Sequence, residues 1–104
     1  MRTFRKLVRD RIPEIIAANG EKAVTRVLDD AEFLTALEHK LLEEVQEMRQ
    51  NKAERKVELA DIYEVLDALI QAYGFSKGEI LEIQNKKRQE RGGFDRRLFL
   101  EGTG

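Results

Sequence analysis

A long amphipathic pattern without helix-breaking residues constrains this chain more than any other feature. From Asp30 to Tyr73 there is no glycine or proline, and apolar residues recur every three or four positions, as on one face of a helix. A pattern of that length without caps indicates a coiled coil or two helices in succession. The segment from Arg49 to Lys56 is polar apart from Ala53. We therefore expect a tight turn there, between helices over 30–50 and 53–73.

Such a turn determines which residues of the two helices stand level. If the chain folds back midway between Lys52 and Ala53, residues whose numbers sum to 105 face each other. Glu47 then faces Glu58, and Glu44 faces Asp61 at a level about 4.5 Å further along the helix axes. In one continuous helix, Glu47 and Glu58 would instead be about 16 Å apart and could share no ligand.

Glu58 stands where the helical phase requires an apolar side chain. At about 100° per residue, Ile62, Val65 and Leu69 all lie within about 60° of it. Glu44 lies on the border of the corresponding apolar stripe of the preceding helix. An uncompensated buried charge costs on the order of several kcal/mol. A divalent cation is a partner that four or five such carboxylates can share.

The composition limits the classes of partner and location. The chain of 104 residues suits one domain over 1–104, and its charges nearly cancel, with 19 basic and 20 acidic residues. Bulk electrostatics therefore favour neither a nucleic acid polymer nor a membrane surface as partner. Cysteine is absent, no apolar run is long enough to cross a bilayer, and the N-terminus lacks the apolar core of a secretion signal. The cytoplasm is the expected location.

The remaining segments complete an all-α prediction. We expect a short helix over 13–19, with Pro13 in its first turn, and a fourth helix that starts at Ser76 and ends at Gly92. Short extended segments are expected at 23–28 and 96–100, the second beside the first. The predicted fold is a helical bundle built on an antiparallel αα-hairpin. Because four helices leave the apolar faces of the hairpin undercovered, we expect a homodimer or homotetramer.

The acidic motifs resemble those of the all-α NTP pyrophosphatases, the MazG-like superfamily. The superfamily signature E-E-x-x-E followed by E-x-x-D corresponds to Glu43–Glu47 and Glu58–Asp61. The segments K-L-V-R-D-R-I-P-E at 6–14 and K-R-Q-E-R-G-G-F at 87–94 resemble the flanks of a small house-cleaning branch with phosphoribosyl-ATP pyrophosphohydrolase-like members. The connection at 48–57 is shorter than the family's usual one, which leaves room for only a tight hairpin.

The resemblance implies a Mg²⁺ site, in which Mn²⁺ is expected to substitute. Resemblance and helical phase together favour four metal ligands: Glu44, Glu47, Glu58 and Asp61. Glu43 and Glu47 are the implied catalytic residues. Three roles are possible for Glu43. It could hydrogen-bond the metal ligands without touching the ion, bind an additional ion, or act as the base that activates water.

A triphosphate substrate also requires cationic groups. Lys40, one turn before Glu44, is the first candidate, and Lys87 with Arg91 on the last helix are the others. For that last pair, an ordinary role at a helix end is equally compatible with the sequence. Lys6 and Arg9 are weaker candidates, since the segment around them is more typical of a structural clasp.

These features predict a Mg²⁺-dependent enzyme that cleaves a nucleoside triphosphate between its α- and β-phosphates. The products would be a nucleoside monophosphate and pyrophosphate, and the substrates noncanonical or deoxy nucleotides. Two alternatives remain at this stage: a phosphoribosyl-ATP pyrophosphatase, and a non-catalytic helical dimerisation module whose acids pair with lysines and arginines.

Overall fold

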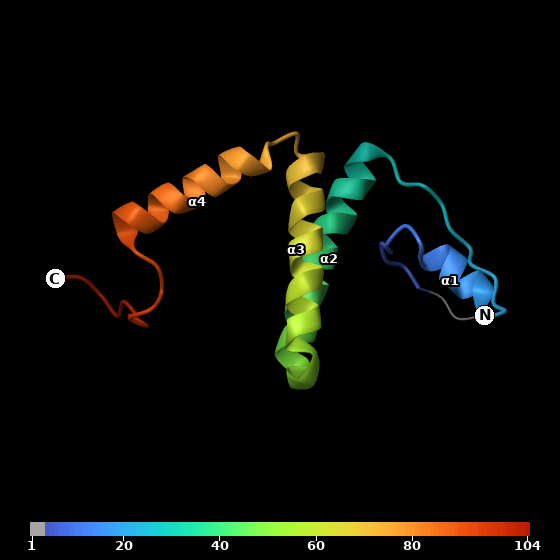
Figure 1. Ribbon diagram of the computed structural model, residues 1–104, viewed down its shortest axis with the longest axis horizontal. Helices are drawn as coiled ribbons and strands as arrows, with labels where there is room; N and C mark the ends of the chain where they lie inside the picture. Colours follow the sequence, from blue (N-terminus) through green and yellow to red (C-terminus); the bar gives the residue numbers. More distant parts are fainter. Residues whose placement is uncertain (1–3) are drawn as a thin grey trace.

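The computed structural model describes residues 4–104, and it is helical throughout its regular parts. Its elements are α1 (Ile12–Ala18), α2 (Asp30–Gln50), the 3₁₀ turn η1 (Lys52–Glu54), α3 (Arg55–Ala72) and α4 (Lys77–Arg91), as Figure 1 shows. The range contains no β-strand. None of these helices is both long enough and apolar enough to span a membrane. The all-α prediction is confirmed, with boundaries within about two residues of those expected.

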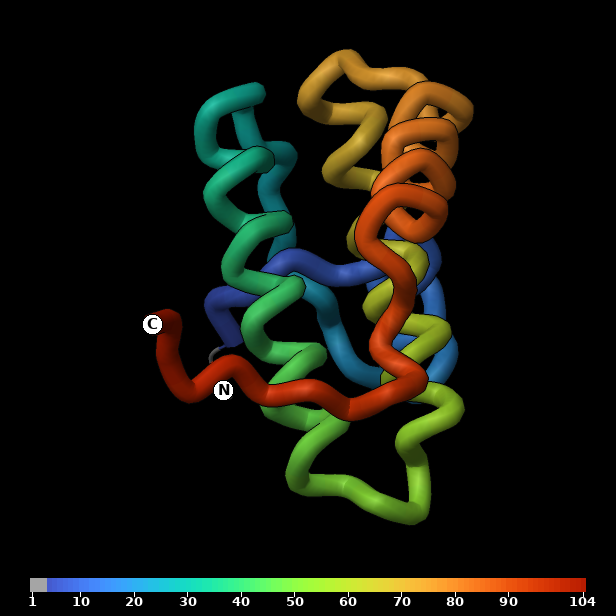
Figure 2. The backbone as a smooth tube through the Cα atoms, turned by 90° about the vertical axis from the view of Figure 1, so that its left-hand side faces the viewer, coloured from blue at the N-terminus to red at the C-terminus, as the bar shows by residue number. Residues whose placement is uncertain are grey.

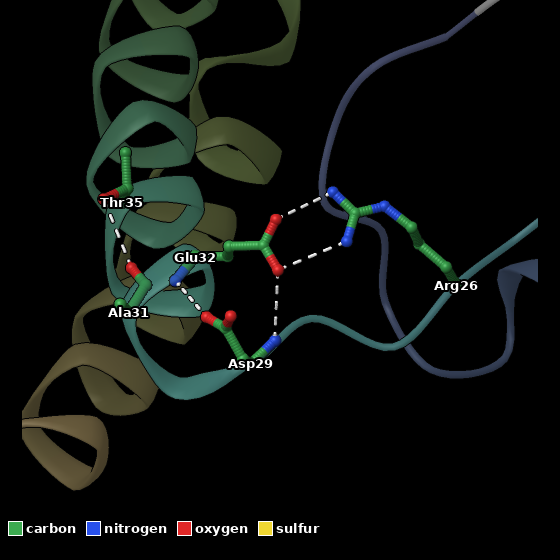
Figure 3. Close-up of polar contacts among 5 residues, drawn as sticks. All are labelled: Arg26, Asp29, Ala31, Glu32 and Thr35. Atoms are coloured by element: carbon green, nitrogen blue, oxygen red, sulfur yellow. Dashed lines mark hydrogen bonds and ion pairs between the residues drawn. The ribbon is translucent and has the colours of Figure 1, made fainter.

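The start of α2 is fixed by a complete capping box. Asp29 accepts a hydrogen bond from the backbone N–H of Glu32 at 2.8 Å, and the Glu32 carboxylate accepts one from the backbone N–H of Asp29 at 3.4 Å. Arg26 donates to both oxygens of the same carboxylate, at 2.9 and 3.2 Å (Figure 3). The two otherwise unpaired donors of the first turn are therefore satisfied, and the chain entering α2 is tied to it.

The predicted turn between α2 and α3 is present. After Gln50 the backbone passes through Asn51 and η1 and then returns as α3, so that the two helices run antiparallel (Figures 1 and 2). The Arg55 guanidinium donates to the carbonyl of Met48 at 3.2 Å, which satisfies an acceptor left open at the end of α2. The hairpin on which the acidic site depends is thus confirmed.

The core of the molecule is the seam between α2 and α3. Leu37, Val65 and Leu69 are its buried residues. Partly buried side chains pack around them: Leu7, Phe33, Leu41, Ala68 and Ala72. The presence of Leu7 shows that the N-terminal segment also lies against the hairpin.

The outer helices contribute little to this core. Ser76 caps α4 by accepting a hydrogen bond from the Glu79 N–H, but α4 has no buried residue and leads away from the hairpin (Figure 1). No helix in the described part of the chain packs against α1. The radius of gyration is 18.1 Å, whereas a compact domain of this length would have about 13 Å. The chain therefore has an open shape around a small core.

The two expected extended segments do not pair. Residues 23–28 have no regular structure, and the tail makes a turn near 95–96 before continuing without regular structure to 100. Figure 1 places the segment before α2 and the tail after α4 on opposite sides of the hairpin. The expectation that they lie side by side is wrong because α4 carries the tail away from the hairpin, and a strand needs a neighbour to satisfy its backbone groups.

Candidate metal centre

Three carboxylates from the two arms of the hairpin converge. Glu44 and Glu47 lie one turn apart on one face of α2, and Glu58 lies in the first turn of α3. One oxygen from each lies within 4.8 Å of the others. This agrees with the predicted level pairing of Glu47 with Glu58, because only a hairpin can bring these two residues together.

Glu44 is the most buried member of this cluster. Among residues 4–104 it is the one charged residue in the buried class, with 4% of its surface exposed. Its Oε2 atom and the Oε2 atom of Glu58 are both enclosed without a hydrogen-bond donor. Glu47 is exposed, so the cluster has one open side.

The order of burial differs from the sequence prediction. The helical phase identified Glu58 as the acid displaced furthest into the apolar stripe, with Glu44 on a border. In the structure Glu44 is buried and Glu58 only half-buried. The reason is position along the hairpin: Glu58 lies in the first turn of α3, close to the polar connection, whereas Glu44 lies a turn deeper against the core.

The environment of Glu44 opposes its ionisation. Burial raises the pKa of Glu44 to about 7, and the adjacent carboxyl groups of Glu58 and Glu47 act in the same direction. The Lys40 ammonium, 3.7 Å from Glu44 Oε1, lowers the pKa but does not compensate. A carboxyl group with this combination of burial and like-charged neighbours is typical of a functional site.

Asp61, the fourth predicted ligand, is close to the cluster but has another partner. Its Oδ1 atom accepts a hydrogen bond from Arg9 Nη2 at 2.8 Å. Its charge contributes to the raised pKa of Glu44, which places it within electrostatic range. Three of the four predicted ligands therefore converge, and the fourth is paired with the N-terminal segment.

The predicted phosphate-binding residues are divided between two regions. Lys40 adjoins the cluster and also lies 3.9 Å from Glu43, which is itself at the rim. Lys87 and Arg91 are exposed on α4, which leads away from the hairpin (Figure 1). Within one chain, then, Lys40 and Arg9 are the cations next to these acids, and Lys87 and Arg91 are not brought to them.

Sequence reasoning missed the pairing of Arg9 with Asp61. The two residues are 52 positions apart, and no local periodicity relates them. The available signal is the basic segment around Arg9, which is typical of a structural clasp but does not specify the residue that Arg9 contacts.

The cluster fits a divalent, oxygen-preferring cation. Mg²⁺ bonds oxygen at about 2.1 Å, so the three oxygens, which lie within 4.8 Å of one another, would have to move closer together to hold one ion. The enclosed Oε2 atoms of Glu44 and Glu58 supply acceptors that the protein itself leaves without a donor. A cation would satisfy these atoms and compensate the clustered negative charge.

Comparisons with known proteins identify no family for this chain. No protein-family model and no solved structure match it. An uncharacterised protein of Mycolicibacterium smegmatis is 57% identical over 44 residues, which is 42% of this chain. The match spans 45% of that relative's length.

Proposed function

We propose that this protein is a Mg²⁺-dependent nucleotide pyrophosphohydrolase of the MazG-like type, located in the cytoplasm. It would hydrolyse a nucleoside triphosphate to the monophosphate and pyrophosphate. The observation that carries the proposal is the buried carboxyl of Glu44, next to Glu47 on the same helix and Glu58 across the hairpin. One enclosed oxygen of Glu44 and one of Glu58 lack a donor. The resemblance of both acidic motifs and both flanks to that superfamily supplies the reaction type.

The chemistry follows from the charges involved. Water attacks the α-phosphorus, the bond from that phosphorus to the bridging oxygen breaks, and pyrophosphate leaves with the electron pair. Bound Mg²⁺ would neutralise phosphate charge and orient the water. Glu44 and Glu58 would hold the cation from the buried side, while the exposed Glu47 faces solvent, from which substrate and water must enter.

The remaining polar residues have supporting roles in this proposal. Lys40 would balance the charge of Glu44 and contact a phosphate at the rim. Glu43, which precedes Glu44 and is half-buried, would accept the proton of the attacking water. Because a carboxylate beside a dication has a low proton affinity, Glu43 would promote the reaction through its position more than through its basicity.

The direct test is a nucleotide panel with Mg²⁺, including deoxy and noncanonical triphosphates and phosphoribosyl-ATP. We expect pyrophosphate as product. Glu58→Gln should lower turnover by about two orders of magnitude or more while helicity is retained, because it removes a ligand charge. Glu64→Gln is the matched control, since Glu64 is exposed outside the cluster. Release of orthophosphate, or full activity in Glu58→Gln, would contradict the proposal.

Metal titration separates an enzyme from a helical dimerisation module. Mg²⁺ or Mn²⁺ at a hundred times its Kd should stabilise the folded protein by about 2.7 kcal/mol, and chelation should reverse this. A module whose acids merely pair with lysines and arginines would show no such response. The measurement is thermal unfolding with and without the metal, and it requires no substrate.

We also propose that the active form is a homo-oligomer, a dimer or tetramer. Along α3 and its C-cap, the 4-3-4-3 spacing of a coiled-coil seam is followed by Leu59, Tyr63, Leu66, Ile70 and Tyr73. This stripe is adjacent to the one that faces α2, and Tyr63 is 68% exposed. A second hairpin packed on the stripe would form a four-helix bundle around the pair of sites.

A further inference from the structure

The N-terminal segment contacts the hairpin through an apolar and a charged side chain. Leu7 packs against the edge of the core, and Arg9 forms an ion pair with Asp61 on α3. The helix that follows, α1, packs against no other helix in the described part of the chain. Arg9 thus makes a polar contact between this segment and α3.

The same ion pair lies beside the acidic cluster. Arg9 Nη2 is 2.8 Å from Asp61 Oδ1, with the two side chains 58% and 31% exposed. Asp61 also lies one turn after Glu58 on α3, so the pair is next to the cluster. The guanidinium therefore neutralises an acid at the edge of the cluster, and its positive charge opposes the approach of a cation.

We propose that Arg9 is an exchangeable counter-ion, a latch that closes on Asp61 when the cluster holds no metal and opens when a divalent cation binds. The inference rests on the proposed metal site and concerns its regulation. A dication among Glu44, Glu47 and Glu58 carries twice the charge of the guanidinium and competes with it for Asp61, while a partly exposed ion pair contributes little and is readily exchanged. Metal binding thereby loosens the N-terminal segment and frees Arg9 at the rim for an anionic group.

The first test measures Mn²⁺ affinity in the absence of nucleotide. Arg9→Gln removes the competing charge, so the Kd for Mn²⁺ should fall by about two- to fivefold, the range that a partly exposed ion pair can supply. Arg5→Gln is the matched control, because it removes an exposed charge from the same segment and keeps the pair between Arg9 and Asp61. Arg5→Gln should bind Mn²⁺ as the unmodified chain does.

The second test measures amide hydrogen exchange of residues 4–12 with and without Mn²⁺. Exchange should accelerate on metal binding in the unmodified chain. In Arg9→Gln it should be fast already and independent of metal. Amide exchange reports the motion of the segment, whereas the Mn²⁺ affinity also responds to any change of charge near the site.

The outcomes separate the latch from the metal site itself. Mn²⁺ binding with an unchanged or weaker affinity in Arg9→Gln overturns the latch and leaves the proposed function standing. If Mn²⁺ does not change the amide exchange of residues 4–12 in the unmodified chain, the latch is likewise overturned and the proposed function still stands. Absence of Mn²⁺ binding in the unmodified chain overturns the metal site, and the latch with it.

Discussion

The carboxyl group of Glu44 couples folding to proton binding. Its ordinary pKa is 4.5, and burial beside Glu58 and Glu47 raises it to about 7 in the folded chain. Between these two values the folded state binds more protons than the unfolded state. The free energy of unfolding of the metal-free protein therefore falls as pH rises from about 4.5 to about 7, and levels off above that range.

Glu44→Gln tests this coupling, because glutamine has the shape of protonated glutamate and carries no charge. At pH 8 without metal the variant should be more stable than the unmodified chain, by up to about 3 kcal/mol. Near pH 4 the two should be similar. Urea unfolding with chelator across this pH range measures the difference.

The same substitution should eliminate stabilisation by Mn²⁺, since it removes a buried ligand charge. Glu64→Gln, on an exposed position of α3 outside the cluster, serves as control. A Glu44→Gln protein that is less stable than the unmodified chain at pH 8 would show that the carboxylate is well compensated without metal.

At the level of elements, local chemistry made the helices predictable. The 30–50 helix matches α2, and Ser76, the expected start of the fourth helix, caps α4. The level pairing of Glu47 with Glu58 was predictable because a turn of few residues fixes the register of the two arms. The burial of Glu44 and its contact with Glu58 depend on how far each residue lies from the turn along the seam between α2 and α3. The helical phase of a single helix does not give this distance.

The segments that failed prediction lack such local constraints. Residues 23–28 contain β-branched side chains, yet a strand is stable only beside a partner, and the direction of α4 removes the tail as that partner. Likewise, nothing near Arg9 in the sequence specifies Asp61. Contacts between distant segments depend on the arrangement of whole elements, so periodicity and caps do not determine them.

The network at the start of α2 provides a prediction at this scale. Asp29→Ala should lower the free energy of unfolding by about 1 kcal/mol, because it removes the acceptor for the first turn. Arg26→Ala should have a much smaller effect, since Arg26 is 69% exposed and its pair with Glu32 is screened by solvent. Urea unfolding of both variants measures the contrast. An equal loss in the two would mean that the ion pair, rather than the cap, fixes the helix start.

The described part of the molecule buries few apolar side chains and leaves many exposed. Leu37, Val65 and Leu69 are the buried apolar residues of the described range, while apolar side chains on α3, on α4 and in the tail remain exposed. The radius of gyration of 18.1 Å reflects the same imbalance. A second copy on the stripe that begins at Leu59 would cover part of this surface and enlarge the core by continuing the seam of the hairpin.

Tyr63→Glu tests this assembly, because Tyr63 is the most exposed aromatic residue of the stripe and a charge there would be buried in the dimer. We expect the unmodified protein to be a dimer or tetramer by light scattering, and the variant to shift to the monomer and to unfold at a lower temperature. Gln71→Glu introduces the same charge on an exposed position of α3 outside the stripe and should remain oligomeric. If the unmodified chain is a stable monomer, or if Tyr63→Glu assembles as before, another surface or another partner must cover the apolar face. Glu44, Glu47 and Glu58 come from a single hairpin, so a monomeric variant should still bind Mn²⁺, which distinguishes loss of assembly from loss of the site.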